Sequence, residues 1–210
     1  MNIYETNVKR IIDFLVAFCG LIVLSPAILI IALIVRKEDG GKAFYRGDRL
    51  GKDGIPFRIY KFRTMVMNAE NIGGSSTPLD DPRITRVGLF LRRYKLDELP
   101  QLFNIIKGDM SLVGPRPQVP WALNMEDPVN QIILSVRPGL TDYASVRFNN
   151  EGELLKGASN PDKAYFELIH PEKVRLAKEY VENVTLRTDL KLMGMTILTV
   201  LKRGGGENGQ

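Results

Sequence analysis

Two adjacent carboxylates, Asp97 and Glu98, stand in the segment RRYKLDELPQ (residues 92–101) among three cationic side chains. The structural interpretation is that acid–base runs are commonly solvated helix faces, and that Asp97 only caps a helix whose first turn tolerates Pro100. The functional interpretation is that a carboxylate at a helix N-terminus stays ionised, coordinates a hard cation and attacks phosphorus to form an acyl phosphate. On these residues alone both interpretations are open.

A reaction at phosphate also needs cations that neutralise its charge. In VGPRP, Pro115 and the proline after Arg116 restrict the backbone, so the planar guanidinium is held at a low cost in entropy. Arg137 in RPG is a shorter version of the same arrangement. Lys61 and Arg63 in YKFRTM share one face if that segment is a strand. We expect these residues to bind substrate phosphates, although each alone has a structural interpretation.

The charge balance favours anionic partners. The chain has 210 residues, with 29 Lys and Arg against 24 Asp and Glu, and a formal net charge of +5. Its basic residues are scattered and lack the aromatic-interleaved stripe of a nucleic-acid-binding surface, so we expect no nucleic acid partner. A Cys/His metal cluster is excluded, because the chain has one histidine, His170, and one cysteine, Cys19, which lies in the most apolar segment.

The segment from Phe14 to Val35 is uncharged, apolar and long enough to cross the hydrocarbon core of a bilayer. Ser25-Pro26 falls in its middle, where proline removes a backbone donor and kinks or ends a helix. Basic residues flank both ends, so the positive-inside rule gives no orientation. A re-entrant helical hairpin and a single kinked spanning helix are both open. Near the start of the segment, we expect Asp13 to pair locally with its basic neighbours, Lys9 and Arg10.

The rest of the chain predicts a small, mostly helical α+β domain. Glycines between β-prone pieces at residues 43–65 indicate a β-hairpin, and residues 67–85 form a polar loop. Two helices are expected to meet near Asp97, since Pro100 cannot continue a helical ladder. After a variable loop, helical patterns cover residues 163–169, 172–182 and 186–202, the last of which suits either core packing or a membrane interface.

Several of these motifs together resemble one family. DPRITRVGLFLRR, LDELPQLFNIIKGDMSLVGPRP and VRPGLT, preceded by YKFRTM and a charge-flanked apolar segment, are similar to the bacterial sugar transferases called monotopic phosphoglycosyl transferases. The likeness runs from about Val8 to Lys202. It implies a re-entrant helix–break–helix membrane hairpin over residues 1–37, turned at Ser25 and Pro26. Residues 38–210 would form a catalytic domain with amphipathic interfacial helices, on the cytoplasmic face of the bacterial inner membrane.

The resemblance also implies a reaction. Asp97 would attack the β-phosphate of a UDP-sugar, expel UMP and carry the phosphosugar covalently until a polyprenyl phosphate, undecaprenyl phosphate, accepts it. Asp97 would also contact Mg²⁺ or Mn²⁺, and Glu98 would handle a proton or shape the metal site. The basic positions that match the family's phosphate or nucleotide contacts are Lys61, Arg92, Arg116 and Arg137. A homodimer is compatible with this resemblance.

One departure from the family concerns the loop after Gly139. Many members have glycine and tryptophan where this chain has Asp142 and Tyr143, which suggests a different sugar. Two rival interpretations lie outside this chemistry. A non-catalytic membrane-anchored adaptor that binds anionic lipid would not require Asp97, and an ordinary glycosyltransferase would release UDP and show an alternating βα pattern, which the sequence lacks.

Overall fold

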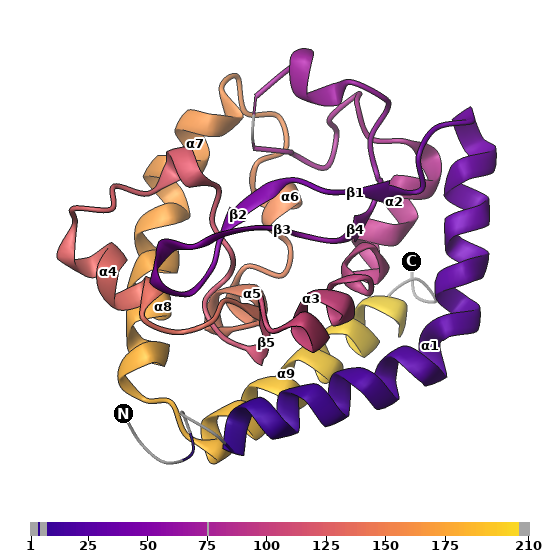
Figure 1. The fold of residues 1–210 in the computed structure, drawn as a ribbon. Coiled ribbons are helices and arrows are strands. Elements are labelled where there is room, and N and C mark those ends of the chain that lie inside the picture. Colours follow the sequence, from indigo (N-terminus) through magenta and orange to yellow (C-terminus); the bar gives the residue numbers. More distant parts are fainter. Residues whose placement is uncertain (1–3, 5–7, 75, 206–210) are drawn as a thin grey trace.

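The computed structural model describes residues 4, 8–74 and 76–205, which form a mostly helical α+β fold with small two-stranded sheets. The predicted fold class is confirmed at this level. Figure 1 shows the short strands in the middle of the molecule, α1 along its lower and right-hand edges, and the C-terminal helices behind and to the left. The α-helices are α1 (Lys9–Asp39), α2 (Arg86–Arg93), α3 (Gln101–Lys107), α4 (Pro128–Leu134), α5 (Tyr143–Arg147), α6 (Glu151–Leu154), α7 (Pro161–Leu168), α8 (His170–Glu182) and α9 (Leu186–Gly205).

Helix α1 is 31 residues long and apolar enough to cross a membrane. A core helix of a soluble protein would bury such residues, but here most large apolar side chains of α1 are exposed. The exposed ones are Ile11, Phe14, Leu15, Val16, Phe18, Ile22, Val23, Leu29, Ile30, Leu33 and Ile34. This exposure is consistent with membrane association.

The predicted break at Ser25-Pro26 is wrong in one respect, because α1 is a single helix with Pro26 inside it. Proline cannot donate to the carbonyl oxygen of Ile22, four residues earlier. The hydroxyl of Ser25 donates to that oxygen instead, at 2.9 Å. The serine therefore satisfies the carbonyl that the proline leaves free, and the helix bends without ending. Its two arms lie at a wide angle in Figure 1 and do not run side by side as in a hairpin.

The strands confirm the predicted hairpin and include a second antiparallel pair. β2 (Asp48–Leu50) and β3 (Pro56–Arg58) pair antiparallel around the 3₁₀ turn η2 (Lys52–Gly54). Outside them, β1 (Phe44–Tyr45) pairs antiparallel with β4 (Lys61–Phe62). A parallel pair, β5 (Ser111–Val113) with β6 (Gly139–Thr141), joins distant parts of the chain. Further 3₁₀ turns are η3 (Ala69–Asn71), η4 (Leu96–Glu98) and η5 (Pro120–Ala122).

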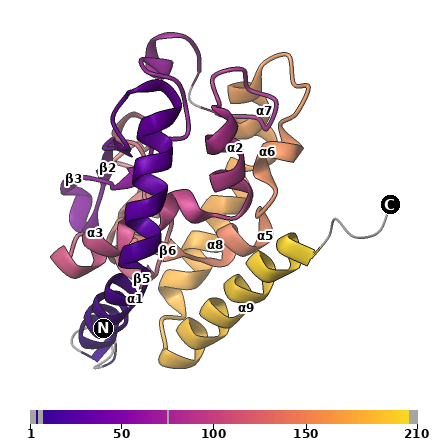
Figure 2. The ribbon, with the colours of Figure 1, turned by 90° about the vertical axis from the view of Figure 1, so that its right-hand side faces the viewer.

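The C-terminal helices confirm the predicted helical stretches. His170 begins α8, and a proline in the first turn suits this helix start. In α9, Leu192 and Asp189 are buried, while Leu190, Leu198 and Leu201 are exposed, so the helix has an inner and an outer apolar face. Figures 1 and 2 both show α9 and the first arm of α1 along the lower side of the molecule.

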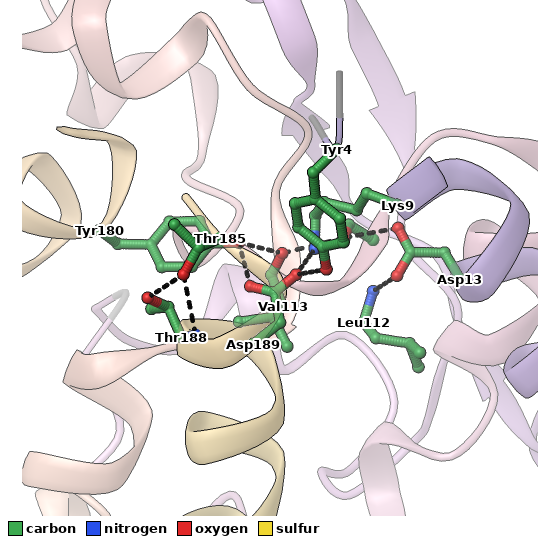
Figure 3. Close-up of polar contacts among 10 residues, drawn as sticks. Tyr4, Lys9, Asp13, Leu112, Val113, Tyr180, Thr185, Thr188 and Asp189 are labelled. Carbon is green, nitrogen blue, oxygen red and sulfur yellow. Dashed lines mark hydrogen bonds and ion pairs between the residues drawn. The ribbon is translucent and has the colours of Figure 1, made fainter. Parts of the chain in front are cut away.

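A buried polar network ties the start of α1 to this lower side (Figure 3). Asp189 of α9 accepts hydrogen bonds from the hydroxyls of Tyr4, at 2.6 Å, and Tyr180, at 2.8 Å, and forms an ion pair with Lys9. Asp13 of α1 accepts from the Ser111 hydroxyl, at 2.7 Å, and from a backbone N–H of β5. The expectation that Asp13 pairs with its own basic neighbours is therefore wrong, since its burial directs it to donors of β5.

Candidate active site

The Asp97–Glu98 pair lies on η4, between α2 and α3. Helix α2 begins at its cap Thr85, whose side chain accepts from the Gly88 N–H, and it ends at Arg93. The expected junction of two helices is confirmed. The expected cap is wrong, because Pro100 occupies the N-cap position of α3 and no side chain caps that helix. Asp97 therefore does not serve as the helix cap that the structural interpretation predicted.

Glu98 is the hub of the ion pairs in this site. Its Oε1 accepts from Lys61 Nζ of β4 at 2.8 Å and from a terminal guanidinium nitrogen of Arg116 at 2.7 Å. The Glu98 side chain is 10% exposed, against 18% for Lys61 and 33% for Arg116, so the carboxylate end of both pairs is shielded from water. The structure thus brings together Lys61, Glu98 and Arg116 from three separate parts of the chain.

Asp97 has a different environment from its neighbour. Its Oδ2 lies 3.9 Å from Lys61 Nζ, and within the described residues no hydrogen bond to its carboxylate is found. The side chain is buried all the same, with 11% of its surface exposed. Asp97 therefore keeps its oxygen lone pairs available for a substrate or a cation.

The pKa values of the two carboxyl groups are shifted in opposite directions. Burial raises the pKa of the Asp97 carboxyl, and the charge of Glu98 adds to that rise against the opposing charge of Lys61. Burial alone would also raise the pKa of Glu98, but Arg116 and Lys61 outweigh it and hold that pKa well below its ordinary range. Asp97 is therefore the more basic carboxylate of the pair, and Glu98 is a fixed negative charge that positions cations.

Arg92 approaches the pair from α2. Its Nε donates to the Thr64 hydroxyl at 2.8 Å, which fixes the guanidinium next to the loop after β4. Burial lowers the pKa of Arg92, while the charge of Asp97 opposes that effect. Arg92 and Asp97 are therefore electrostatic neighbours.

The backbone before Arg116 is held by the β5–β6 pair. The N–H of Gly139 donates to the Pro115 carbonyl oxygen at 2.9 Å. A Cβ on Gly139 would lie 2.1 Å from the nitrogen of Gly114, so the close approach requires glycine. Asp142 completes the arrangement, because its carboxylate accepts from the Arg116 N–H at 3.3 Å and caps α5 through the Ser145 N–H at 2.7 Å.

Two predicted phosphate ligands lie elsewhere. Arg63 is buried, and its guanidinium forms an ion pair with Asp39 and hydrogen bonds with backbone carbonyls, including that of Val35 at the end of α1. Arg137 donates to the Gly108 carbonyl at 2.9 Å, beyond the C-terminal end of α3, whereas Asp97 precedes its N-terminal end. The expectation that Lys61 and Arg63 share one face of a strand is wrong, because β4 ends at Phe62 and Arg63 lies beyond it. The length of α3 separates Arg137 from the pair.

Comparisons with known proteins identify the family to which this arrangement belongs. A family model described as "Bacterial sugar transferase" matches residues 4–203, nearly the whole chain. The chain belongs to the bacterial sugar transferase family. This bears out the resemblance expected from the motifs.

Three relatives illustrate the range of bacterial sugar transferases to which the chain is similar. The exopolysaccharide production protein ExoY of Sinorhizobium fredii is 37% identical, over 93% of this chain and 87% of its own length. The undecaprenyl-phosphate galactose phosphotransferase of Salmonella typhimurium is 36% identical over 94% of this chain. The UDP-N-acetylgalactosamine-undecaprenyl-phosphate N-acetylgalactosaminephosphotransferase of Aeromonas hydrophila is 34% identical over 92% of this chain. The chain spans 41% and 44% of the length of the last two relatives.

Sequence reasoning missed three structural features around the Asp97–Glu98 pair of this bacterial sugar transferase. Thr64, which positions Arg92, carries no signal beyond lying near YKFRTM. Asp142 was noted only as a departure from the family, although a carboxylate before a helical pattern predicts an N-cap. Lys95 is in the central motif, and its left-handed backbone conformation, with φ of 57°, depends on the tertiary structure.

The residues present in this sugar transferase fit a divalent cation of the Mg²⁺ type. Mg²⁺ is commonly held by one or two carboxylates together with substrate phosphates, so a dedicated cluster of protein ligands is not required. Within the described residues no group of three or more His, Cys, Asp or Glu side chains is placed to hold a metal ion. The Asp97 carboxylate supplies a hard oxygen donor without competing hydrogen bonds from the described residues. Such a donor suits Mg²⁺ that is held partly by substrate phosphates.

Proposed function

We propose that the chain is a membrane phosphoglycosyl transferase that moves a sugar 1-phosphate from a UDP-sugar to a polyprenyl phosphate such as undecaprenyl phosphate. The observation that supports it best is the contrast within one dipeptide: Asp97 is buried, more basic than usual and unbonded among the described residues, whereas Glu98 is committed to Lys61 and Arg116. Relatives named as undecaprenyl-phosphate sugar phosphotransferases agree with this class of reaction.

The proposed reaction has two displacements at one phosphorus atom. An oxygen of Asp97 attacks the β-phosphorus of the UDP-sugar, the bond to the bridging oxygen breaks, and UMP leaves with that oxygen. An oxygen of the polyprenyl phosphate then attacks the same phosphorus and releases the Asp97 carboxylate. The product carries the sugar on a lipid-linked diphosphate, and such a product would begin an exopolysaccharide, capsule or glycoconjugate.

The cations around the pair suit the charge that develops on phosphate oxygens. Arg92, Lys61 and Arg116 are preorganised by Thr64 and Glu98, so they need little reorganisation when substrate binds. When bound at Asp97, Mg²⁺ or Mn²⁺ would neutralise phosphate charge and orient the diphosphate. Lys61 and Arg116 neutralise Glu98, while no hydrogen bond to the Asp97 carboxylate is found within the described residues, so its lone pairs stay available for attack.

The same proposal places the chain at the cytoplasmic face of the bacterial inner membrane. Basic residues precede and follow the apolar part of α1, and the bend at Pro26 lets both ends return to one side as a re-entrant segment over residues 1–37. Residues 38–210 then form the catalytic domain, with the exposed apolar face of α9 at the interface. A homodimer stays a prediction.

The test is release of UMP by the purified protein with Mg²⁺ and polyprenyl phosphate, screened over UDP-sugars with the galactose and N-acetylgalactosamine derivatives first. Asp97→Asn is expected to fold and to release no UMP, because an amide cannot attack phosphorus. Without a lipid acceptor, the wild-type protein is expected to accumulate a radiolabelled phosphosugar on Asp97. Asp48→Asn is the matched control, since the Asp48 side chain is 66% exposed on the β-hairpin.

Near-normal turnover by Asp97→Asn, or a label on another residue, would contradict the nucleophile. Release of UDP in place of UMP would indicate transfer of the sugar without its phosphate. Binding of anionic lipid that is unaffected by Asp97→Asn, with no turnover for any UDP-sugar, would favour the non-catalytic adaptor.

A further inference from the structure

Lys95 has a backbone conformation that its residue type does not favour. Three described residues other than glycine have positive φ angles, and these are Asp53, Asn68 and Lys95. Asparagine and aspartate enter the left-handed region readily, because their short polar side chains hydrogen-bond locally, but lysine has no such compensation. Lys95 adopts φ 57° and ψ 19° at the reversal between α2 and η4, two residues before Asp97. Strain of this kind gathers at functional sites.

Among the cations around the Asp97–Glu98 pair, the Lys95 ammonium has the fewest polar contacts with described residues. Lys61 and Arg116 are bound to Glu98, and Arg92 is bound to Thr64 through Nε. Across the described part of the chain, no hydrogen bond or ion pair is found for Lys95 Nζ. Its charged neighbours are Glu98, Arg116, Asp97 and Lys61. The ammonium therefore has three N–H donors available among the charged groups around Asp97 and Glu98.

The charge balance of the pair leaves room for an anion. Asp97 and Glu98 carry two negative charges when ionised, and four cations surround them: Lys61, Arg92, Lys95 and Arg116. The excess of positive charge suits a phosphate or diphosphate group. If Lys95 served only the turn, asparagine or glycine would supply the same backbone without strain.

We propose that Lys95 is a phosphate-binding residue of this site, which donates from its ammonium to a non-bridging oxygen of a bound substrate phosphate. The inference rests on the proposed function for the identity of the substrates. Two sources offer the same chemistry: the diphosphate of the UDP-sugar and the phosphate of the polyprenyl lipid. The backbone strain at Lys95 is maintained because it aims the ammonium at that phosphate.

The experiment compares wild type with Lys95→Asn, Lys95→Gly and Lys95→Arg. The first two remove the charge and accept the left-handed backbone, and the third keeps a cation. Lys156→Asn, an exposed position on the loop after α6, controls for the loss of one positive charge. The measurements are the Kd for UDP, the KM for the UDP-sugar, the KM for polyprenyl phosphate and the thermal midpoint.

We expect Lys95→Asn and Lys95→Gly to raise the thermal midpoint by about 2 °C and to weaken phosphate binding about tenfold. If the contact is to the diphosphate, the loss falls on UDP binding and on the KM for the UDP-sugar. If it is to the lipid phosphate, UDP binding is unchanged and the KM for polyprenyl phosphate rises. Lys95→Arg should retain most of the affinity, and Lys156→Asn should match wild type.

A raised thermal midpoint with all three binding constants within about twofold of wild type would overturn the proposal and leave Lys95 as a strained linker. UDP binding separates this failure from failure of the proposed function. If no UDP-sugar is turned over by wild type but Lys95→Asn still loses affinity for UDP, the phosphate site stands and the proposed reaction does not.

Discussion

Arg116 hydrogen-bonds to Glu98 and not to the adjacent Asp97, with a distance of 2.7 Å between a terminal guanidinium nitrogen and Oε1. Lys61 is likewise closer to Glu98, at 2.8 Å, than to Asp97, at 3.9 Å. One carboxylate of the dipeptide is therefore neutralised by protein cations, and the other makes no hydrogen bond within the described residues. This asymmetry has consequences for stability as well as for reactivity.

Glu98→Gln is expected to destabilise the protein by about 3 kcal/mol, because it leaves Lys61 and the half-buried Arg116 without their counter-ion. Asp97→Asn is expected to be neutral or stabilising, since burial raises the pKa of that carboxyl and thus disfavours its charge. Denaturant or thermal unfolding of the two variants side by side measures the difference. A greater loss of stability in Asp97→Asn than in Glu98→Gln would refute the assignment.

Tyr180 predicts a loss of stability at alkaline pH. Burial, and then the charge of Asp189, raise the pKa of its phenol above the unfolded value of about 10. A folded pKa above the unfolded one stabilises the fold below pH ~10, and that contribution is lost as pH rises through the folded pKa. The thermal midpoint of wild type should therefore fall above pH ~10.

Tyr180→Phe tests this assignment at a single hydroxyl. The change removes hydrogen bonds to the Val113 carbonyl, at 3.0 Å, and to Asp189, at 2.8 Å. It should cost about 1–3 kcal/mol near neutral pH and make the alkaline decline shallower. An unchanged alkaline decline in the variant would show that another group controls it.

Pro26→Leu is expected to straighten α1. Leucine supplies the N–H that proline lacks, so the Ile22 carbonyl no longer depends on the Ser25 hydroxyl. In a Cys19→Ala background, single cysteines at Val8 and Lys37 should react with an impermeant thiol reagent only after the inner membrane is opened. In Pro26→Leu, one of the two should become reactive from the periplasm. Periplasmic labelling of Val8→Cys while Pro26 is retained would rule out the re-entrant topology.

Gln101 carries a buried amide nitrogen, Nε2, for which no hydrogen-bond partner is found in the described part of the chain. Gln101→Met has a similar volume and removes the unpaired donor, so stability should rise by about 1 kcal/mol. The measurement is the free energy of unfolding, with UMP release assayed alongside. A destabilised variant would contradict the assignment of Nε2 as an unpaired donor.

Local patterns in the sequence were enough to predict several elements of the fold and the family. The apolar run of α1, the glycine-marked hairpin, the junction of helices before Pro100 and the C-terminal helices follow from periodicity, turn residues and the missing proline donor. The bacterial sugar transferase family was recognisable from motifs that keep their order along nearly the whole chain. These features depend on neighbours in the sequence, so they were predictable.

Only the tertiary structure decided which charges meet. Lys61 and Arg63 are two residues apart, yet Lys61 reaches Glu98 while Arg63 binds Asp39, because the fold presents different partners to each. In the sequence, only the resemblance to the family gives Asp97 and Glu98 different roles, since the two residues are adjacent carboxylates. Their distinction arises from burial and from an arginine brought in by the parallel pairing of β5 and β6, which join segments far apart in the chain. Electrostatic roles depend on distance in space, and spacing along the sequence does not determine that distance.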